Sequence, residues 1–187
     1  MEERIIFLEN KEKAIKKITR KLKKEKSNEK RMVFSIKLTE GNYLILTNKV
    51  WLFGFLFSTK ETTGAFYELP EIKEGYVVLR RKNEKSTKEI AKMIEEYTKQ
   101  EWKGTVSLNP KKDLPTTILW SAYFGGQITL APEVVCSIAS ILKTLEPKRI
   151  SLCVPEEKEK PVLLKPDPLY EPLHEKDWFC LVMPVIL

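Results

Sequence analysis

Basic side chains crowd the segment 11–26, and they are the clearest chemical feature of this sequence. Apolar residues recur in this segment at helical spacing, which predicts an amphipathic helix with a narrow apolar stripe of Ala14, Ile15, Ile18 and Leu22. Lysine and arginine cover the rest of the predicted helix surface, with few acidic residues between them. Such side chains neutralise phosphates and release counterions, which gives salt-sensitive binding without sequence preference. The candidate nucleic-acid contacts are Lys13, Lys16, Lys17, Arg20, Lys21 and Lys24.

A solvated helix in a lysine-rich protein is the alternative interpretation, because charge runs often only keep a protein soluble. The whole chain has 187 residues, a formal charge of +7 and a pI of about 9.2. A basic balance favours polyanionic partners such as nucleic acid. The length suffices for a substantial core. The longest apolar stretch, residues 50–57, is too short to span a bilayer, so we expect no membrane partner.

Residues with catalytic potential are sparse. His174 is the one histidine, and it lies in a proline-containing acidic segment that we expect to be a solvated loop. The sequence has no glycine-rich phosphate loop, nucleophile elbow or metal-spaced histidine set. The three cysteines, Cys136, Cys153 and Cys180, lie far apart in apolar contexts, which predicts buried reduced thiols in a cytoplasmic protein. We therefore expect no enzymatic activity, no cofactor and no metal.

Trp51, Phe53, Phe55 and Phe57 alternate along one predicted strand. Aromatic side chains can stack on the bases of single-stranded nucleic acid. However, a stripe on one face of a strand is more typical of core packing, which we favour here.

The elements that would carry these residues alternate between strands and helices. Helices are predicted over 11–26, 87–102 and 133–145. Strands are predicted over 4–8, 32–38, 43–46, 50–57, 66–69, 76–80, 105–108, 117–124, 127–132, 150–154, 160–166 and 179–187.

A strand followed by a helix opens three segments, near residues 4, 76 and 127, and hairpins rather than regular crossovers follow. This predicts an α+β fold in which helices pack on one side of antiparallel sheets. The expected segments are 1–70, with the basic helix, 71–126, a second strand–helix unit or an insertion, and 127–187. The most plausible seam is 70–75. The predicted core includes Ile15, Ile18, Phe34, Ile36, Ile138, Leu142 and Leu145.

The last sixty or so residues carry a recognisable layout. Gln-Ile-Thr-Leu-Ala-Pro at 127–132 precedes an apolar-striped helix, and Lys-Pro-Val-Leu-Leu-Lys-Pro at 160–166 precedes a final strand that contains Met183 and Pro184. This layout resembles the last half-domain of the bacterial β sliding clamp, the ring that tethers DNA polymerase to DNA. That family typically ends in a strand containing Met-Pro.

A second stretch resembles the same family. Residues 34–52 look like the clamp hairpin, in which a strand, an acidic-glycine turn and a second strand lead into a Thr-Asp-Gly-aromatic-Arg-Leu-like motif. Here the motif residues are Thr47, Asn48, Lys49, Val50, Trp51 and Leu52, without the glycine and the arginine. In the family, this motif and the Met-Pro strand wall a hydrophobic pocket for short linear peptides. The pocket residues that the resemblance implies are Thr47, Trp51, Leu52, Val182, Met183, Pro184 and Ile186.

The resemblance implies a clamp-like, DNA-associated tethering or processivity factor for replication or repair. The implied partners are double-stranded DNA, a DNA polymerase or other proteins with clamp-binding motifs, and further copies of the chain in a ring. A full bacterial clamp subunit carries three domains and is about twice as long. Two alternatives remain: a monomeric interaction module that uses a clamp-type pocket, and a non-specific basic nucleic-acid-binding protein with an unrelated mixed sheet.

Overall fold

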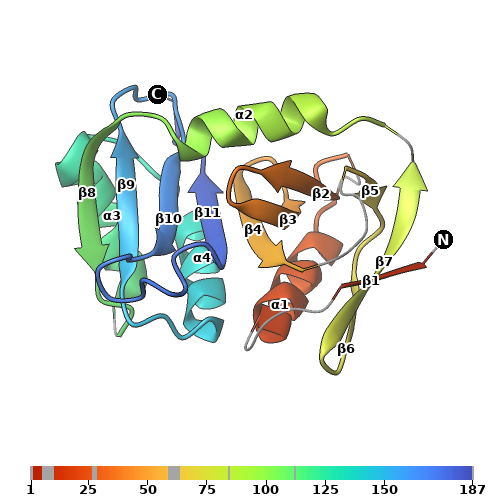
Figure 1. Ribbon diagram of the computed structural model, residues 1–187. Coiled ribbons are helices and arrows are strands. Elements are labelled where there is room, and N and C mark those ends of the chain that lie inside the picture. The colour runs from red at the N-terminus through yellow and green to blue at the C-terminus, as the bar shows by residue number, and fades with distance from the viewer. Residues whose placement is uncertain are drawn as a thin grey trace. The chain divides into compact units, whose positions relative to one another are not determined.

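The computed structural model describes residues 2–5, 11–26, 29–58, 64–83, 85–111 and 113–186 (Figure 1). The chain forms two compact units, Met1–Glu95 and Glu96–Leu187, which we call unit 1 and unit 2. The predicted segment 71–126 is divided between them, and the seam expected at 70–75 lies inside unit 1. Every strand pair described within a unit is antiparallel, so the predicted α+β class is confirmed. Among the described residues, no helix has the length and apolar character needed to cross a membrane.

Unit 1 is built on a three-stranded meander of β2 (Met32–Leu38), β3 (Gly41–Thr47) and β4 (Trp51–Phe57). The predicted aromatic stripe lies in its core, because Trp51, Phe53, Phe55 and Phe57 are all buried. Helix α1 (Lys11–Lys23) contacts β3 with its apolar stripe. The rings of Phe53 and Phe55 stack with centroids 6.0 Å apart. These side chains are therefore not available to stack on bases.

Four further strands extend this sheet. They are β1 (Glu2–Ile5), β5 (Phe66–Tyr67), β6 (Glu71–Lys73) and β7 (Tyr76–Asn83). The order in unit 1 is β1-β7-β5-β2-β3-β4, and β6 forms a hairpin with β7. The predicted strand at 4–8 is confirmed over 4–5, and its remaining residues lie outside the described part of the chain. Helix α2 (Lys88–Thr98) follows β7 and crosses the boundary between the units.

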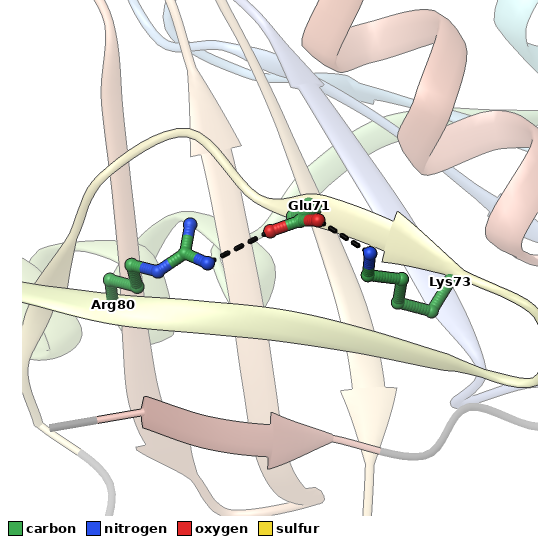
Figure 2. A network of polar contacts seen from close by, with 3 residues as sticks. All are labelled: Glu71, Lys73 and Arg80. Atoms are coloured by element: carbon green, nitrogen blue, oxygen red, sulfur yellow. Dashed lines mark hydrogen bonds and ion pairs between the residues drawn. The ribbon is translucent and has the colours of Figure 1, made fainter.

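A small ion network joins the β6–β7 hairpin. Figure 2 shows Glu71 between Lys73 and Arg80, with N–O distances of 2.6 Å and 2.9 Å. The hydrogen bond from Lys73, followed by that from Arg80, lowers the pKa of Glu71. The contribution of Glu71 to stability is therefore present above its unfolded pKa and is lost as the pH falls through the lowered folded value. Because all three side chains are largely exposed, the network contributes little free energy.

Unit 2 repeats the plan of a helix followed by a three-stranded meander. Helix α4 (Pro132–Thr144) precedes β9 (Ile150–Pro155), β10 (Val162–Pro166) and β11 (Trp178–Val182). The edge strand β8 (Trp102–Leu108) pairs with β9, which gives the order β11-β10-β9-β8. Ile138 and Leu142 of α4 are buried as predicted, whereas Leu145 is only half-buried.

The predicted strand at 117–124 is wrong, because these residues belong to helix α3 (Leu114–Gly126). Leu114, Ile118, Ala122 and Gly126 are buried at a spacing of four, and Pro115 lies in the first turn, where a missing N–H costs nothing. The opposite face carries Trp120, Tyr123 and Phe124, which are 62%, 54% and 64% exposed. Since both faces of α3 carry apolar residues, the sequence shows no alternation of polar and apolar residues at helical spacing. The predicted strand at 127–132 is also absent, and residues 127–131 form an irregular connection.

The cysteines differ from the expectation of three buried thiols. Cys153 and Cys180 are buried, but Cys136 is exposed on α4. Desolvation by burial raises the pKa of Cys153, and it raises the pKa of Cys180 well above the usual value. We therefore predict that one thiol per chain, Cys136, reacts with an aromatic disulfide reagent at neutral pH. All three should react in denaturant. Replacing Cys136 by Ser should remove the native reaction, and a remaining fast thiol would contradict the burial described here.

Candidate nucleic-acid interface and peptide-binding surface

Helix α1 buries its apolar stripe and carries most of its basic residues elsewhere on its surface. Ala14, Ile15, Ile18 and Leu22 are fully buried, as the predicted stripe requires. Thr19 is also buried, and its hydroxyl donates to the carbonyl oxygen of Ile15 at 2.7 Å. The helix is thereby fixed on unit 1 by one face, which leaves the other face for its charged side chains.

The predicted nucleic-acid contacts lie on or beside that solvent-facing surface. Lys13, Lys16, Arg20 and Lys24 are exposed, and Lys17 and Lys21 are half-buried. Lys24 follows the last helical turn. By contrast, Lys11 at the start of the helix is only 3% exposed, so it lies outside this surface. We call the six residues Lys13, Lys16, Lys17, Arg20, Lys21 and Lys24 the basic face of α1.

Partial burial and neighbouring positive charges both act on Lys21 within this face. Desolvation, and then the positive charges of Lys17 and Lys24, lower the pKa of Lys21. Within the described residues, no carboxylate lies at ion-pair distance from Lys16, Arg20 or Lys24. An anion placed among these side chains would relieve the repulsion and raise the pKa of Lys21 again. Such a cluster of positive charges can attract phosphates.

The motif at the turn between β3 and β4 is a closed hydrogen-bonded structure. The Thr47 hydroxyl donates to the carbonyl oxygen of Trp51 at 2.7 Å, and it accepts from the backbone N–H of Lys49 at 3.0 Å. The Asn48 side chain accepts from the N–H groups of Val50 and Trp51, both at 3.0 Å. Lys49 takes the left-handed conformation, with φ of 73°, at the position where the clamp motif has glycine.

This turn unites Thr47 and Trp51, but both are only 4% exposed. Leu52 is half-buried. Of the three predicted pocket residues of unit 1, Leu52 therefore has the most side-chain surface accessible to a ligand. Their role in a pocket stays a prediction.

The four predicted pocket residues of unit 2 lie at the end of the chain, where β11 ends at Val182. Val182 is 1% exposed, whereas Met183 is 36% and Ile186 75% exposed, and Pro184 is half-buried. The predicted strand at 179–187 is therefore too long, because Pro184 has no N–H to donate to a ladder. The Val185 N–H donates instead to the carbonyl oxygen of Thr129 at 2.8 Å, which holds this segment beside the start of α4.

The C-terminal residues 183–186 are thus an anchored apolar surface and not an interior strand. Elsewhere in the described residues, no group of three histidine, cysteine, aspartate or glutamate side chains is arranged to hold a metal ion. His174 is exposed, and its Nδ1 lies 2.8 Å from an Asp177 carboxylate oxygen within a turn. This pair lies in the connection between β10 and β11.

The fold just described is that of the bacterial β sliding clamps. The β subunit of DNA polymerase from Streptococcus pyogenes matches all of this chain at a TM-score of 0.54 with 11% sequence identity. The sliding clamp from Bacillus subtilis matches all of it at 0.54 with 10% identity. The Helicobacter pylori β clamp bound to a DNA ligase peptide matches 97% at 0.54 with 9% identity.

The chain spans less than two thirds of the length of each of these clamp structures. The values are 66% for the Streptococcus pyogenes subunit and 64% for each of the other two. No protein-family model matches the chain, and no curated protein matches it. At these identities the comparisons establish the fold, which confirms the resemblance seen in the sequence at the level of architecture. The roles of individual residues do not follow from it.

Proposed function

We propose that this protein is a non-enzymatic, clamp-like tethering factor that holds double-stranded DNA through the basic face of α1 and recruits partners through an apolar peptide-binding surface. The observation that carries the proposal is the basic face itself. It consists of five basic side chains on helix α1 and of Lys24 directly after it, and the helix is fixed by a fully buried apolar stripe. Such a face binds phosphates without reading sequence, as a tether that moves along DNA requires.

Duplex binding is the test of this proposal. Fluorescence anisotropy should give dissociation constants that agree within about threefold for two duplexes of equal length and unrelated sequence, because phosphate contacts carry no sequence information. A marked preference for one duplex would contradict the tethering function. No binding to either duplex at low salt would favour the alternative of a protein-interaction module.

The peptide-binding surface is supported by the exposed C-terminal residues. The Helicobacter pylori clamp of like fold was solved with a DNA ligase peptide. In this chain, Met183, Val185 and Ile186 expose apolar surface on a segment anchored by one backbone hydrogen bond. The proposed ligand is a linear peptide rich in glutamine and leucine, because leucine side chains can pack on these exposed apolar residues.

Deleting residues 185–187 should separate binding from folding. Val185 and Ile186 are 41% and 75% exposed, so the free energy of unfolding should fall by less than about 1.5 kcal/mol, the scale of one lost hydrogen bond. Binding of the peptide, measured by calorimetry, should be lost. An unfolded or aggregated truncated protein would show instead that these residues belong to the core. Unchanged peptide affinity would remove the C-terminal segment from the binding surface.

A further inference from the structure

Helix α3 presents a cluster of aromatic rings to solvent. Trp120, Tyr123 and Phe124 are each more than half exposed, and we call them the aromatic patch of α3. The ring centroids of Trp120 and Phe124 lie 4.2 Å apart in a stacked arrangement. The ring of Tyr123 meets that of Phe124 edge-on, with centroids 5.0 Å apart. The three rings therefore pack on one another and form a single surface.

The opposite face of α3 holds this surface rigidly in unit 2. Leu114, Ile118, Ala122 and Gly126 are buried, and the helix packs on β8 and β9 beside α4 (Figure 1). At Gly126 the approach to β9 leaves no room for a Cβ. A patch on a helix that is fixed in this way loses little conformational freedom when it binds a partner.

The exposed positions of α3 form one uncharged stripe along the helix. Thr116, Trp120, Tyr123, Phe124 and the C-cap residue Gln127 are all exposed, and they follow one another at intervals of one to four residues. Residues three and four apart lie on the same side of a helix, so this stripe can meet a second helix along its length. Helix α3 contains no charged residue at all, whereas the solvent face of a surface helix normally carries charges.

The size of the aromatic patch suits a single helix. Its three side chains are 62%, 54% and 64% exposed, and an aromatic side chain presents about 150–250 Å², so the patch exposes roughly 350 Å². Patches of this size on a monomer are often functional. Two such patches face to face would remove roughly 700 Å² from water, which lies below the standard interface of about 1,200–2,000 Å² and predicts a weak association.

Charge indicates which helix the stripe fits. Among the helices that the structure describes, α1, α2 and α4 expose charged side chains, for example Arg20, Glu96 and Lys143. An aromatic stripe that covered such side chains would desolvate their charges without pairing them. The stripe of α3 can meet its own copy with neither like-charge repulsion nor a buried charge. A surface that pairs with itself forms a two-fold contact.

We infer that two copies of this chain pair through the aromatic patch of α3 about a two-fold axis. The rings of the two copies then cover one another. Because this contact uses the same patch on both copies, assembly stops at two copies and does not extend. The inference goes beyond the proposed function and does not rest on it, since the basic face of α1 takes no part in the contact.

Light scattering of the full chain over a range of concentrations tests the inference. The wild-type mass should rise from 21.8 kDa to twice that value and then stay constant. Replacing Trp120 and Phe124 together by Gln should raise the dissociation constant of the dimer at least about a hundredfold, the scale of two central aromatic residues of an interface. Glutamine is a good helix former and both positions are exposed, so circular dichroism should show an unchanged fold.

Two comparisons separate this contact from general association. Leu173→Ser, which removes another strongly exposed apolar side chain of unit 2, should leave the dissociation constant unchanged. Raising the salt from about 0.05 M to about 0.5 M should not weaken the dimer, because the stripe carries no charge.

Disulfide cross-linking tests the two-fold symmetry. In a chain with Cys136→Ser, the further change Tyr123→Cys places one thiol near the middle of the stripe. A two-fold contact brings this residue of both copies together, so oxidation with copper phenanthroline should give a linked dimer on a non-reducing gel. Leu173→Cys in the same background should give none.

Four outcomes would overturn the inference. They are a wild-type mass that stays at 21.8 kDa at every concentration, a mass that grows beyond two copies, dimerisation of the Gln variant like that of the wild type, and equal weakening by Leu173→Ser. In the first case the aromatic patch serves a different protein. Duplex binding at low salt, measured on the Gln variant, shows whether DNA tethering stands or fails independently of pairing through α3.

Discussion

Reversing the charge of Lys16, Lys17, Arg20 and Lys24 to Glu should abolish duplex binding and leave the fold intact. Each reversal lowers the formal charge by two, so the chain changes from +7 to −1. The loss is concentrated on the basic face of α1, where phosphates would otherwise displace counterions. The fold should persist because the buried stripe of α1 is untouched. Acidic residues near the end of the helix oppose its dipole, so we expect a destabilisation of about 1–2 kcal/mol.

The matched control places the same four reversals on unit 2. Lys103, Lys143, Lys148 and Lys158 are all exposed, and their reversal gives the same formal charge of −1. If location matters, this control should retain most of the duplex affinity at low salt. Anisotropy titrations of both variants, with circular dichroism to check folding, compare the two. Equal losses in both would mean that net charge alone governs binding. Unchanged binding by the α1 variant would remove this helix from the interface.

Replacing Gly126 by Ala should be the most damaging small substitution in unit 2. A Cβ at this position would overlap Cγ1 of Val154 and lie 3.1 Å from its Cβ. Val154 is a fully buried residue of β9, and its β-branched side chain has little freedom to move. Overpacking of this kind costs about 1–3 kcal/mol. Denaturant titration should show the lowered free energy of unfolding. The local cause would be that the end of α3 can no longer pack closely on β9.

Its neighbour provides the control. Gly125 is also helical, but a Cβ there would lie 3.7 Å from Val106 and Val154, at ordinary contact distance. Gly125→Ala should therefore be neutral or stabilise the protein by up to about 1 kcal/mol, through the better helix propensity of alanine. If both variants were equally stable, α3 would not pack on β9 as closely as described.

The sequence predicted best the elements whose period is unambiguous. In α1, charged and apolar residues alternate at helical spacing, so both the helix and its buried stripe could be read directly. The strand at 32–38 was placed at its observed bounds because a polar turn follows it. Most of the predicted core is buried, with Leu145 as the exception.

Helix α3 shows where such reasoning fails. It contains no charged residue, and threonine, isoleucine and aromatic residues favour strands by propensity. Tertiary packing favours the helix here. Gly126 lies close to β9, and every fourth residue from Leu114 to Gly126 is buried. Neither feature can be recognised in the sequence, because polar and apolar positions do not alternate at helical spacing in this segment. The local signals for a helix start were Asp113 at the N-cap and Pro115 in the first turn.

The candidate site was predictable to a similar degree. The exposed lysines of α1 follow from amphipathicity, but the burial of Lys11 depends on packing at the start of the helix. The end of β11 at Val182 could have been inferred from Pro184, which cannot continue a ladder. The sequence predicted only a proline-containing loop at 167–177, because the hydrogen bonds that hold its start join Ser107, Arg149 and Asp167 from distant parts of the sequence.

The salt dependence of duplex affinity tests the central claim most directly. If the basic face of α1 binds phosphates, the logarithm of the association constant should fall linearly with the logarithm of salt concentration, with a slope on the order of −4 for the contacts of one chain. The variant with Glu at 16, 17, 20 and 24 should show no measurable binding over the same range. A wild-type slope near zero, or binding that persists in high salt, would contradict tethering through α1.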